Sequence, residues 1–170
     1  MLLLKKCVQS DLDTLVKISR ETFIEAFEKD NDPVDFQAYL KQAFAIEKIA
    51  SELEHPHSHF YFVFDDHVLV GYFKLNTDTA QTDVHDPKAL EIERIYVFKE
   101  HQGKKIGAWM LQEIICLTRT MEKAFIWLGV WEHNPNAIRF YQRHGFRKFA
   151  EHPYYIGNDK QTDWLFRLSI

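Results

Sequence analysis

Near its carboxyl end the chain reads Asn-Pro-Asn-Ala-Ile-Arg-Phe-Tyr-Gln-Arg-His-Gly-Phe, from residue 134 to residue 146. Asn134 is a favoured helix N-cap, and Pro135 suits the first helical position, where its missing N–H removes no hydrogen bond. Gly145 is typical of the residue that ends a helix, because glycine adopts positive φ without strain. We therefore predict a short helix over residues 134–144. The apolar runs 125–131 and 146–156 on either side of it predict strands.

A second motif lies upstream, between a predicted strand at 90–97 and an amphipathic helix that begins near residue 106. The segment Gln102–Ala108 contains Gly103 and Gly107. Glycines at such a junction let backbone N–H groups approach a ligand, and the helix N-terminus adds the positive end of its dipole. The segment predicts a pyrophosphate-binding loop, or else a plain turn before an ordinary helix. It matches neither the dinucleotide-binding pattern nor the P-loop pattern.

The rest of the chain supplies strands and helices in a mixed order. Residues 2–8 predict a strand, 11–27 a helix with apolar side chains on one face, and 33–44 and 46–54 two shorter helices. The runs 60–64 and 69–76 predict a hairpin, and 162–169 a last strand. This order predicts an α/β fold with one mixed sheet flanked by helices, in a single domain over residues 1–170.

Composition narrows the class of protein. The 170 residues carry a net charge of −4, which disfavours a nucleic-acid partner because no basic excess is available for phosphates. No apolar run approaches the roughly 20 residues that cross a bilayer, so we expect no membrane partner. The first residues lack the order of a secretory signal. Cys7 and Cys116 lie in apolar patterns, which predicts two buried free thiols and a cytoplasmic protein.

Together, the two motifs resemble the GNAT superfamily of acetyl-CoA-dependent N-acetyltransferases. Residues 134–146 have its N-x-x-A-x-x-F-Y-x-x-x-G-F form, and Ile95-Tyr96-Val97 matches the strand that precedes its phosphate loop. Gln102 and Gly107 match that loop, whereas Lys105 stands where the family has a glycine. The resemblance covers nearly the whole chain. It implies a mostly antiparallel twisted sheet of about seven strands whose splayed central pair holds acetyl-CoA, with no metal.

The resemblance also implies roles for individual residues around the cofactor. Backbone groups of Ile95 and Val97 would pair with the pantetheine arm, and an N–H near Ile95 or Tyr96 would polarise the thioester carbonyl. Tyr141 matches the tyrosine that returns a proton to the leaving thiolate, although a core aromatic would fit the same position. Asn134 resembles the residue that bonds the pantetheine arm. The implied cofactor contacts are Ile95, Tyr96, Val97, Gln102, Gly103, Lys104, Lys105, Ile106, Gly107, Ala108, Asn134 and Tyr141.

Transfer to an alkylammonium, with a pKa near 10.4, needs a base at neutral pH. Glu91 and Glu93 lie two apart on a strand and would share a face, roughly 6 to 7 Å apart. Glu91 matches the position that several relatives use as the base. Each carboxylate is a candidate for the base or for a structural role, and a bulge in the strand would break their common phase.

A finer resemblance concerns the acceptor. Residues 90–96, 127–132 and 161–163 look like the PaiA-type branch, which is associated with acetylation of spermidine and spermine. Trp127 and Trp131 would share one face of a strand and fit the core, or Trp131 would line the acetyl or acceptor channel. Negative charges near the acceptor would attract a polyamine, or would form a solvated acidic loop. The candidates are Glu25 and Glu28, with Asp30 and Asp32, in and after the first helix, and Asp159 and Asp163 in the closing hairpin.

The sequence therefore predicts an enzyme that moves an acetyl group from acetyl-CoA to a primary amine of a polycationic acceptor, by direct attack in a ternary complex. We expect a monomer or a homodimer. Two alternatives stay open: an N-acetyltransferase of peptide or protein amines, and a non-catalytic CoA-binding regulator. His55, His57 and His59 lack a cysteine or carboxylate partner in register, which favours loop histidines over a metal site.

Overall fold

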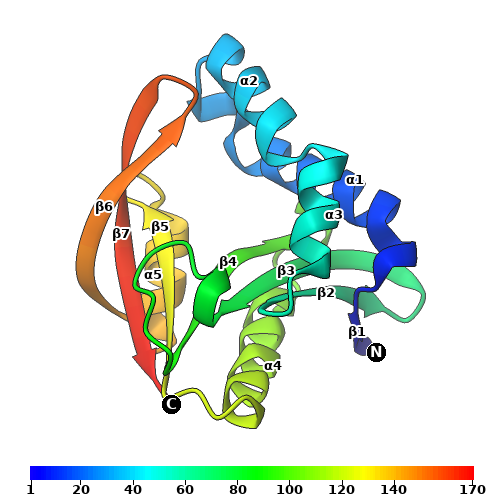
Figure 1. The fold of residues 1–170 in the computed structure, drawn as a ribbon, viewed down its shortest axis with the longest axis vertical. Helices are drawn as coiled ribbons and strands as arrows, with labels where there is room; N and C mark the ends of the chain where they lie inside the picture. Colours follow the sequence, from blue (N-terminus) through cyan, green and yellow to red (C-terminus); the bar gives the residue numbers. More distant parts are fainter.

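The computed structural model covers residues 1–170 and contains one seven-stranded sheet with helices on both faces (Figure 1). The strand order is β1-β2-β3-β4-β5-β7-β6. The strands are β1 (Leu2–Lys6), β2 (Ser58–Asp65), β3 (Val68–Thr77), β4 (Ala89–Val97), β5 (Phe125–Trp131), β6 (Arg147–Ile156) and β7 (Asp159–Ser169). The helices are α1 (Leu12–Phe27), α2 (Pro33–Ala43), α3 (Ile46–Glu54), α4 (Ile106–Thr120) and α5 (Pro135–Arg143), with single 3₁₀ turns η1 (Gln9–Asp11), η2 (Glu28–Asp30), η3 (Asp78–Ala80) and η4 (Lys99–His101).

The predicted mixed α/β sheet of about seven strands is confirmed. Every neighbouring pair is antiparallel except β4 and β5, which run parallel. Parallel pairing at this point follows from the connection, because the chain leaves β4, crosses the sheet through α4 and returns as β5. The first four strands cross the view of Figure 1, while β5, β6 and β7 run nearly vertically in it, so the sheet is strongly twisted at its centre.

The central pair β4–β5 separates soon after it begins. Its parallel register covers three residue pairs, from Ala89 with Phe125 to Glu91 with Trp127. Beyond Glu91, β4 continues along β3, whereas β5 continues along β7. The edges of β4 and β5 that face each other are therefore unpaired between the two strands, as the resemblance implied.

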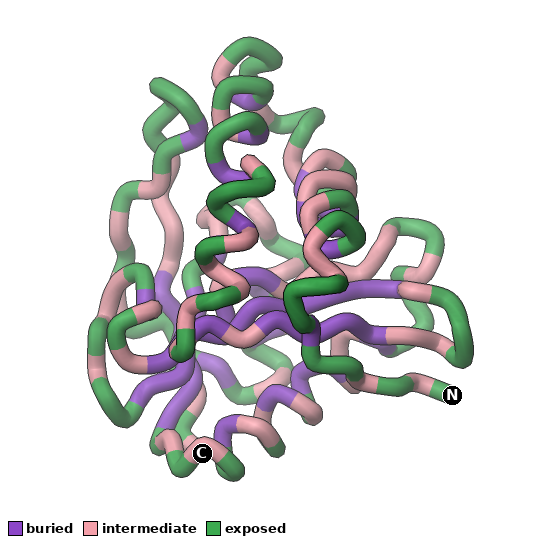
Figure 2. Tube along the Cα trace, turned by 45° about the vertical axis from the view of Figure 1, so that its right-hand side comes forward, coloured by how far each residue is buried: buried purple, intermediate pink, exposed green.

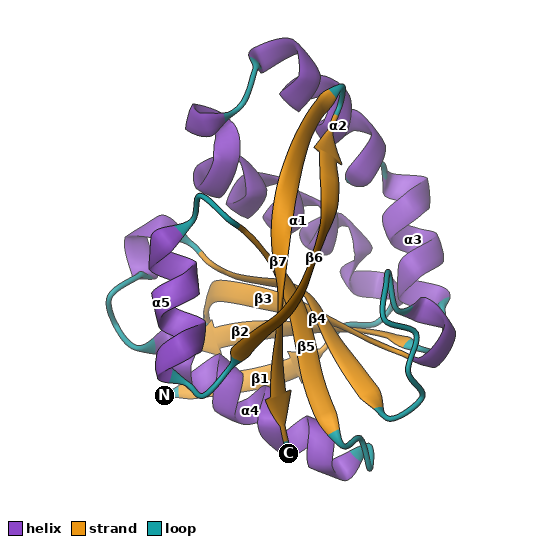
Figure 3. Cartoon of the chain, turned by 90° about the vertical axis from the view of Figure 1, so that its left-hand side faces the viewer, coloured by secondary structure: helices purple, strands orange, loops and turns teal.

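Two hydrophobic cores cover the two faces of the sheet. Alternation along β3 places Tyr72 in the core beneath α1–α3 and Phe73 in the core beneath α4 and α5. α1, α2 and α3 lie together on one side, with α4 on the other (Figure 3). Figure 2 shows the buried residues following the central strands, with exposed residues on the outer helix faces and loop tips. Each fully buried aromatic side chain contributes about 1.5–3 kcal/mol.

A bulge shapes β4. Lys74 pairs with Arg94 and Leu75 pairs with Ile92, so Glu93 has no partner opposite it on β3. A bulge of this kind bends its strand and aims two successive side chains toward the same face. The bulge lies just after Glu91, the last residue of β4 that pairs with β5.

The cysteine prediction needs one correction. Cys7 is buried, but Cys116 is exposed on α4 and forms no disulfide. The buried stripe of α4 contains Ile106, Met110 and Ile114, and Cys116 lies two positions past the last of these, off the stripe. None of the helices is long and apolar enough to cross a lipid bilayer.

Candidate active site

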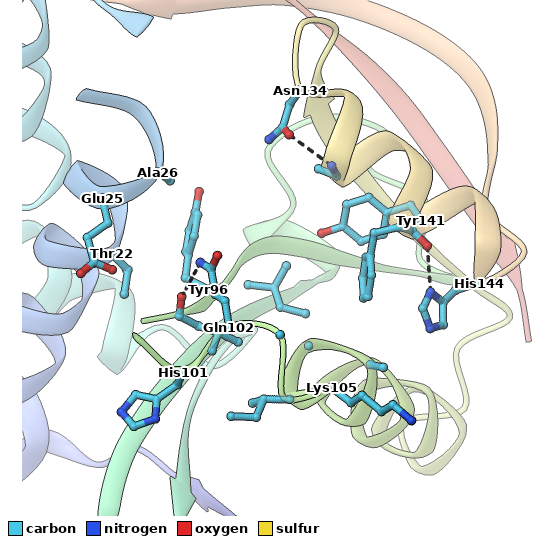
Figure 4. Close-up of a pocket in the computed structure, with 18 of the residues that line it drawn as sticks. Thr22, Glu25, Ala26, Tyr96, His101, Gln102, Lys105, Asn134, Tyr141 and His144 are labelled. Carbon is cyan, nitrogen blue, oxygen red and sulfur yellow. Dashed lines mark hydrogen bonds between the residues drawn. The ribbon is translucent and has the colours of Figure 1, made fainter. Parts of the chain in front are cut away.

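Two adjoining cavities lie where β4 and β5 separate. The first, of about 590 Å³, is bounded by α1, the end of β4, the start of α4 and α5 (Figure 4). The second, of about 280 Å³, lies between α1, β4, β5 and the β6–β7 hairpin. The residues that line both are Ala26, Ile95, Tyr96, Asn134, Ala137 and Tyr141. The two cavities therefore share one wall.

The predicted phosphate loop borders the first cavity. The side-chain amide of Gln102 donates to the carbonyl of Val97 at 3.0 Å, which ties the loop to the end of β4. Gly103 has a φ of +79°, and a Cβ added there would meet nothing within 4 Å. The helical hydrogen bonds of α4 begin at Trp109, whose backbone N–H donates to the carbonyl of Lys105 at 3.1 Å. The preceding amides, at 106–108, have no partner within the helix and are free for an anionic ligand.

Lys105 occupies the N-cap of α4 in the left-handed conformation, with a φ of +62° and a ψ of +13°. Glycine adopts this conformation without strain, whereas other residues do so at a cost. The conformation therefore gives a physical reason for the glycine that the GNAT pattern has at this position. Lys105 adopts this conformation despite its Cβ and adds a cation beside the cavity.

The charge of the first cavity suits a phosphate. Its lining includes Lys105, Arg143 and two histidines, His101 and His144, against one carboxylate, Glu25. Glu25 accepts the backbone N–H of Lys99 at 3.0 Å. The predicted residues of the Gln102–Ala108 segment all line this cavity except Lys104. Sequence reasoning did not select Arg143 and His144, although both lie in the last turn of the quoted motif.

Asn134 and Tyr141 enter the site from α5. The side-chain oxygen of Asn134 accepts the backbone N–H of Ala137 at 3.1 Å, so Asn134 caps the helix as predicted. Tyr141 is 8% exposed and its hydroxyl has no hydrogen-bond partner in the protein. Burial raises the pKa of the Tyr141 phenol above its ordinary value, which keeps the proton on the oxygen at neutral pH. Tyr141 is thus a neutral hydrogen-bond donor where the two cavities meet.

Glu91 and Glu93 meet at one side chain despite the bulge. The amide of Asn76 donates to Glu91 at 3.0 Å and to Glu93 at 2.6 Å. Glu91 is 3% exposed and also accepts the backbone N–H of Thr82 at 2.8 Å and the Thr82 hydroxyl. Burial, with the charge of Glu93, raises the pKa of Glu91 to about 7. Glu91 lies behind the Thr82 loop and lines neither cavity.

Glu93 reaches the second cavity but is already paired with cations. Burial alone would raise its pKa, yet the neighbouring charges of Arg94 and Lys74 outweigh burial and hold the pKa of Glu93 at about 2. Lys74 also reaches Glu52 at 3.0 Å, so these side chains form a buried row of alternating charges. Glu93 is therefore a charge-balanced carboxylate at the cavity wall.

The second cavity is mainly apolar and aromatic. Its aromatic lining consists of Phe23, Phe27, Tyr96, Trp131 and Tyr154. Two carboxylates, Glu93 and Asp163, are its acidic side chains. Of the residues predicted to bind the acceptor, Trp131 lines the second cavity, Glu25 lines the first, and Glu28 lines neither. Trp127, on the same face of β5 as Trp131, is buried and donates its indole N–H to Gln81 at 2.8 Å.

Known proteins share the sequence pattern and the fold of this chain. The sequence model of the acetyltransferase (GNAT) family matches residues 12–146. An uncharacterized N-acetyltransferase of Lactobacillus delbrueckii subsp. lactis is 41% identical over 95% of this chain and 94% of its own length. A spermine/spermidine N(1)-acetyltransferase of Bacillus subtilis is 37% identical over 33% of this chain and 38% of its own. The crystal structure of a PaiA N-acetyltransferase from Thermoplasma acidophilum, in complex with coenzyme A, superposes with a TM-score of 0.79 at 20% identity, covering 100% of this chain and 99% of the other.

Proposed function

Because the chain belongs to the acetyltransferase (GNAT) family and is an acetyl-CoA-dependent N-acetyltransferase, we propose that its acceptor is a small polycationic amine of the spermidine and spermine type. The observation that carries this proposal is the second cavity, which has mainly apolar walls and reaches Gln161 on the β6–β7 hairpin. We propose that the acceptor enters beside Gln161, and this mouth lies near two acidic segments. Apolar walls fit the methylene stem that separates the ammonium groups of a polyamine. Acidic residues at the mouth fit the distal ammonium groups, which stay in water.

The acidic segments meet at the tip of the β6–β7 hairpin, which lies beside the start of α2 (Figure 1). Gln161 on β7 joins them, because its side-chain amide donates to Asn31 at 2.8 Å and to Asp159 at 2.9 Å. Asp35 lies against Gly157 at the hairpin turn. The acids on the α1–α2 side are Glu28, Asp30 and Asp32, which are exposed, and Asp35, which is partly buried. The partial match to the Bacillus subtilis spermine/spermidine enzyme supports the same acceptor class.

In the proposed reaction the first cavity holds acetyl-CoA. Backbone amides at the start of α4, with Lys105 and Arg143, would bind its pyrophosphate. The unpaired edge of β4 at Ile95 and Val97 would bond the pantetheine arm, and a backbone N–H there would stabilise the oxyanion. The acceptor nitrogen attacks the thioester carbonyl directly, a C–N bond forms and the C–S bond breaks. The Tyr141 hydroxyl would protonate the departing thiolate.

Glu91 and Glu93, the two candidates for the base, would have different roles. Glu93 faces the second cavity, but its ion pairs make it a weak proton acceptor. Glu91 has a pKa suited to a base at neutral pH, yet it reaches the cavity only through Asn76 and Glu93. We propose that Glu93 helps bind the cationic acceptor and that Glu91 has a structural role, because it holds Asn76 and the Thr82 loop behind Glu93.

The test is release of thiol from acetyl-CoA with spermidine, compared with a blank without acceptor. Butylamine is the matched control acceptor, because it has the same tetramethylene stem and lacks the distal ammonium groups. We expect kcat/KM for spermidine to exceed that for butylamine by at least tenfold, and the ratio to shrink as salt screens the acidic mouth. Equal kcat/KM for the two amines would overturn the polyamine proposal and leave acetyl transfer intact. A preference for lysine-bearing peptides over spermidine would instead favour a peptide amine as the acceptor.

A further inference from the structure

We propose that Asp163 is the side chain of the second cavity that hydrogen-bonds the reacting nitrogen of the acceptor and takes its proton during transfer. The proposal rests on the proposed function only in requiring an amine acceptor, of whatever class. It adds a catalytic residue on β7, on the opposite side of the cavity from Glu93 on β4.

Asp163 is the one carboxylate of this cavity without a partner. It lines the cavity, and no hydrogen bond or ion pair within the protein reaches its oxygens. Glu93, by contrast, is bonded by Asn76 and paired with Lys74 and Arg94. A half-buried carboxylate with both oxygens unpaired is costly unless a ligand supplies the missing donors. An amine nitrogen carries the N–H donors that this carboxylate lacks.

The position of Asp163 directs its carboxylate over β5, toward the separated strand pair. It stands opposite Trp131 in the β5–β7 register, and a Cβ added to Gly129 would lie 3.1 Å from its Oδ2. Gly129 therefore leaves room for the carboxylate and for a ligand atom beside it. The cavity that Asp163 lines extends from here to Ile95 and Tyr141, where the thioester would be attacked.

The ionisable groups around Asp163 come from three elements. His152 is its cross-strand neighbour on β6 and is paired with Asp83. Tyr154 on β6 and Tyr39 on α2 share a hydrogen bond between their hydroxyls. Glu93 faces the same cavity from β4. Burial raises the pKa of Asp163 to about 6, and the charge of His152 acts in the opposite direction. Asp163 is thus ionised at neutral pH, with a pKa closer to it than that of an ordinary aspartate.

The proton balance of the step is complete. The acceptor reacts as the neutral amine, and its nitrogen becomes positively charged as its lone pair forms the C–N bond. One N–H proton then moves to the Asp163 carboxylate. The C–S bond breaks with its electron pair on sulfur, and the thiolate takes the proton of the Tyr141 hydroxyl. Solvent carries the proton from Asp163 back to the tyrosinate, so amine and thioester become amide and thiol.

The experiment measures pH–rate profiles of wild type, Asp163→Asn and Glu151→Gln, with calorimetry of CoA binding. Glu151 is an exposed β6 residue that touches neither cavity, so E151Q is the matched loss of one carboxylate. We expect D163N to lower kcat at least 100-fold and to leave CoA affinity unchanged. Because the neutral amine reacts, kcat/KM for the acceptor falls with decreasing pH in every variant as the amine becomes protonated. In the wild type this fall steepens below about pH 6, where Asp163 is also protonated, and D163N lacks this additional acid limb. E151Q behaves as the wild type.

Four outcomes would overturn the proposal or assign the base to another residue. Wild-type kcat and an unchanged acid limb in D163N would overturn it, and loss of that limb in Glu93→Gln or Glu91→Gln would assign the base to β4. If D163N does not fold, Gly129→Ala tests the proposal instead. Its added methyl group would crowd the carboxylate of Asp163, which this variant retains. An acceptor KM and kcat equal to wild type in G129A would then overturn the proposal. If the wild type itself releases no thiol with any amine, the proposed function fails and the role of Asp163 is overturned with it, whereas release with an amine other than a polyamine overturns only the polyamine acceptor.

Discussion

Replacing Lys105 with glycine should make the protein more stable, although it removes a side chain beside the first cavity. Lys105 has a φ of +62°, and its side chain forms no hydrogen bond or ion pair in the structure. The substitution therefore relieves backbone strain without breaking a contact within the protein. Few single changes to a lysine in a ligand-binding loop are expected to have this sign.

The size of the effect follows from the backbone. A non-glycine residue in the left-handed conformation costs about 1–2 kcal/mol, and glycine removes this cost. Glycine also makes the unfolded chain more flexible, which lowers stability by about 0.5–1 kcal/mol and offsets part of the gain. The net gain in the free energy of unfolding is therefore about 0.5–1 kcal/mol. For a chain of this length that gain raises Tm by about 1–4 °C.

The matched control is Lys105→Ala, which removes the same charge but keeps a Cβ in the left-handed conformation. Thermal unfolding followed by circular dichroism should give a higher Tm for K105G than for K105A, with K105A at or below the wild type. Calorimetry should find CoA affinity lowered by the same few-fold factor in both variants, because each loses one exposed cation. Equal Tm values for K105G and K105A would refute the assignment of backbone strain to this position.

Three further predictions follow from the same geometry. Gly107→Asp places a carboxylate in the first turn of α4, where the loop is expected to hold pyrophosphate, and should weaken CoA binding at least 100-fold; unchanged affinity by calorimetry would remove the phosphate-loop assignment. Tyr141→Phe should lower kcat at least tenfold and leave CoA affinity within twofold, and an unaltered kcat at saturation would return Tyr141 to a purely structural role. Glu91→Gln should stabilise the protein at high pH, because the folded-state pKa of Glu91, about 7, lies above its ordinary value near 4.5. Folding therefore takes up a proton, the stability contributed by Glu91 falls as pH rises from about 4.5 to 7, and the loss reaches roughly 3 kcal/mol above pH 7. The gain in Tm for E91Q over wild type should accordingly be larger at pH 8.5 than at pH 5, and an equal gain at both would contradict the raised pKa.

The fold was predicted from the order of strands and helices and from the family resemblance of the two motifs, and the bounds of α5 have a local physical cause. Asn134 and Pro135 begin α5 through capping and a fixed φ, and these preferences do not depend on the rest of the chain. The same is true of Gly145, which has a φ of +88° after the end of that helix. The separation of β4 from β5 was implied by the family resemblance, since nothing in the composition of either strand specifies where their pairing stops.

The residues of the second cavity were harder to identify from sequence, because their environment is set by distant segments. The pairing of Glu93 depends on Lys74 from β3 and on the bulge opposite it. Asp163 is one of several acids near the closing hairpin, and only the assembled cavity distinguishes it as the unpaired one. Cys116 was wrongly predicted to be buried. It belongs to the apolar pattern of α4 but lies beside the buried stripe of the helix, and the pattern alone does not separate the two positions.

The wall that the two cavities share has a thermodynamic consequence. Ala26, Tyr96, Ala137 and Tyr141 border both spaces, so a ligand in the first cavity would form part of the lining of the second. The affinity of the acceptor should therefore depend on whether acetyl-CoA is already bound. By reciprocity of linked equilibria, the factor by which acetyl-CoA tightens the acceptor equals the factor by which the acceptor tightens acetyl-CoA. The opening between β4 and β5 would thus act as a coupling element that favours the ternary complex over either binary one.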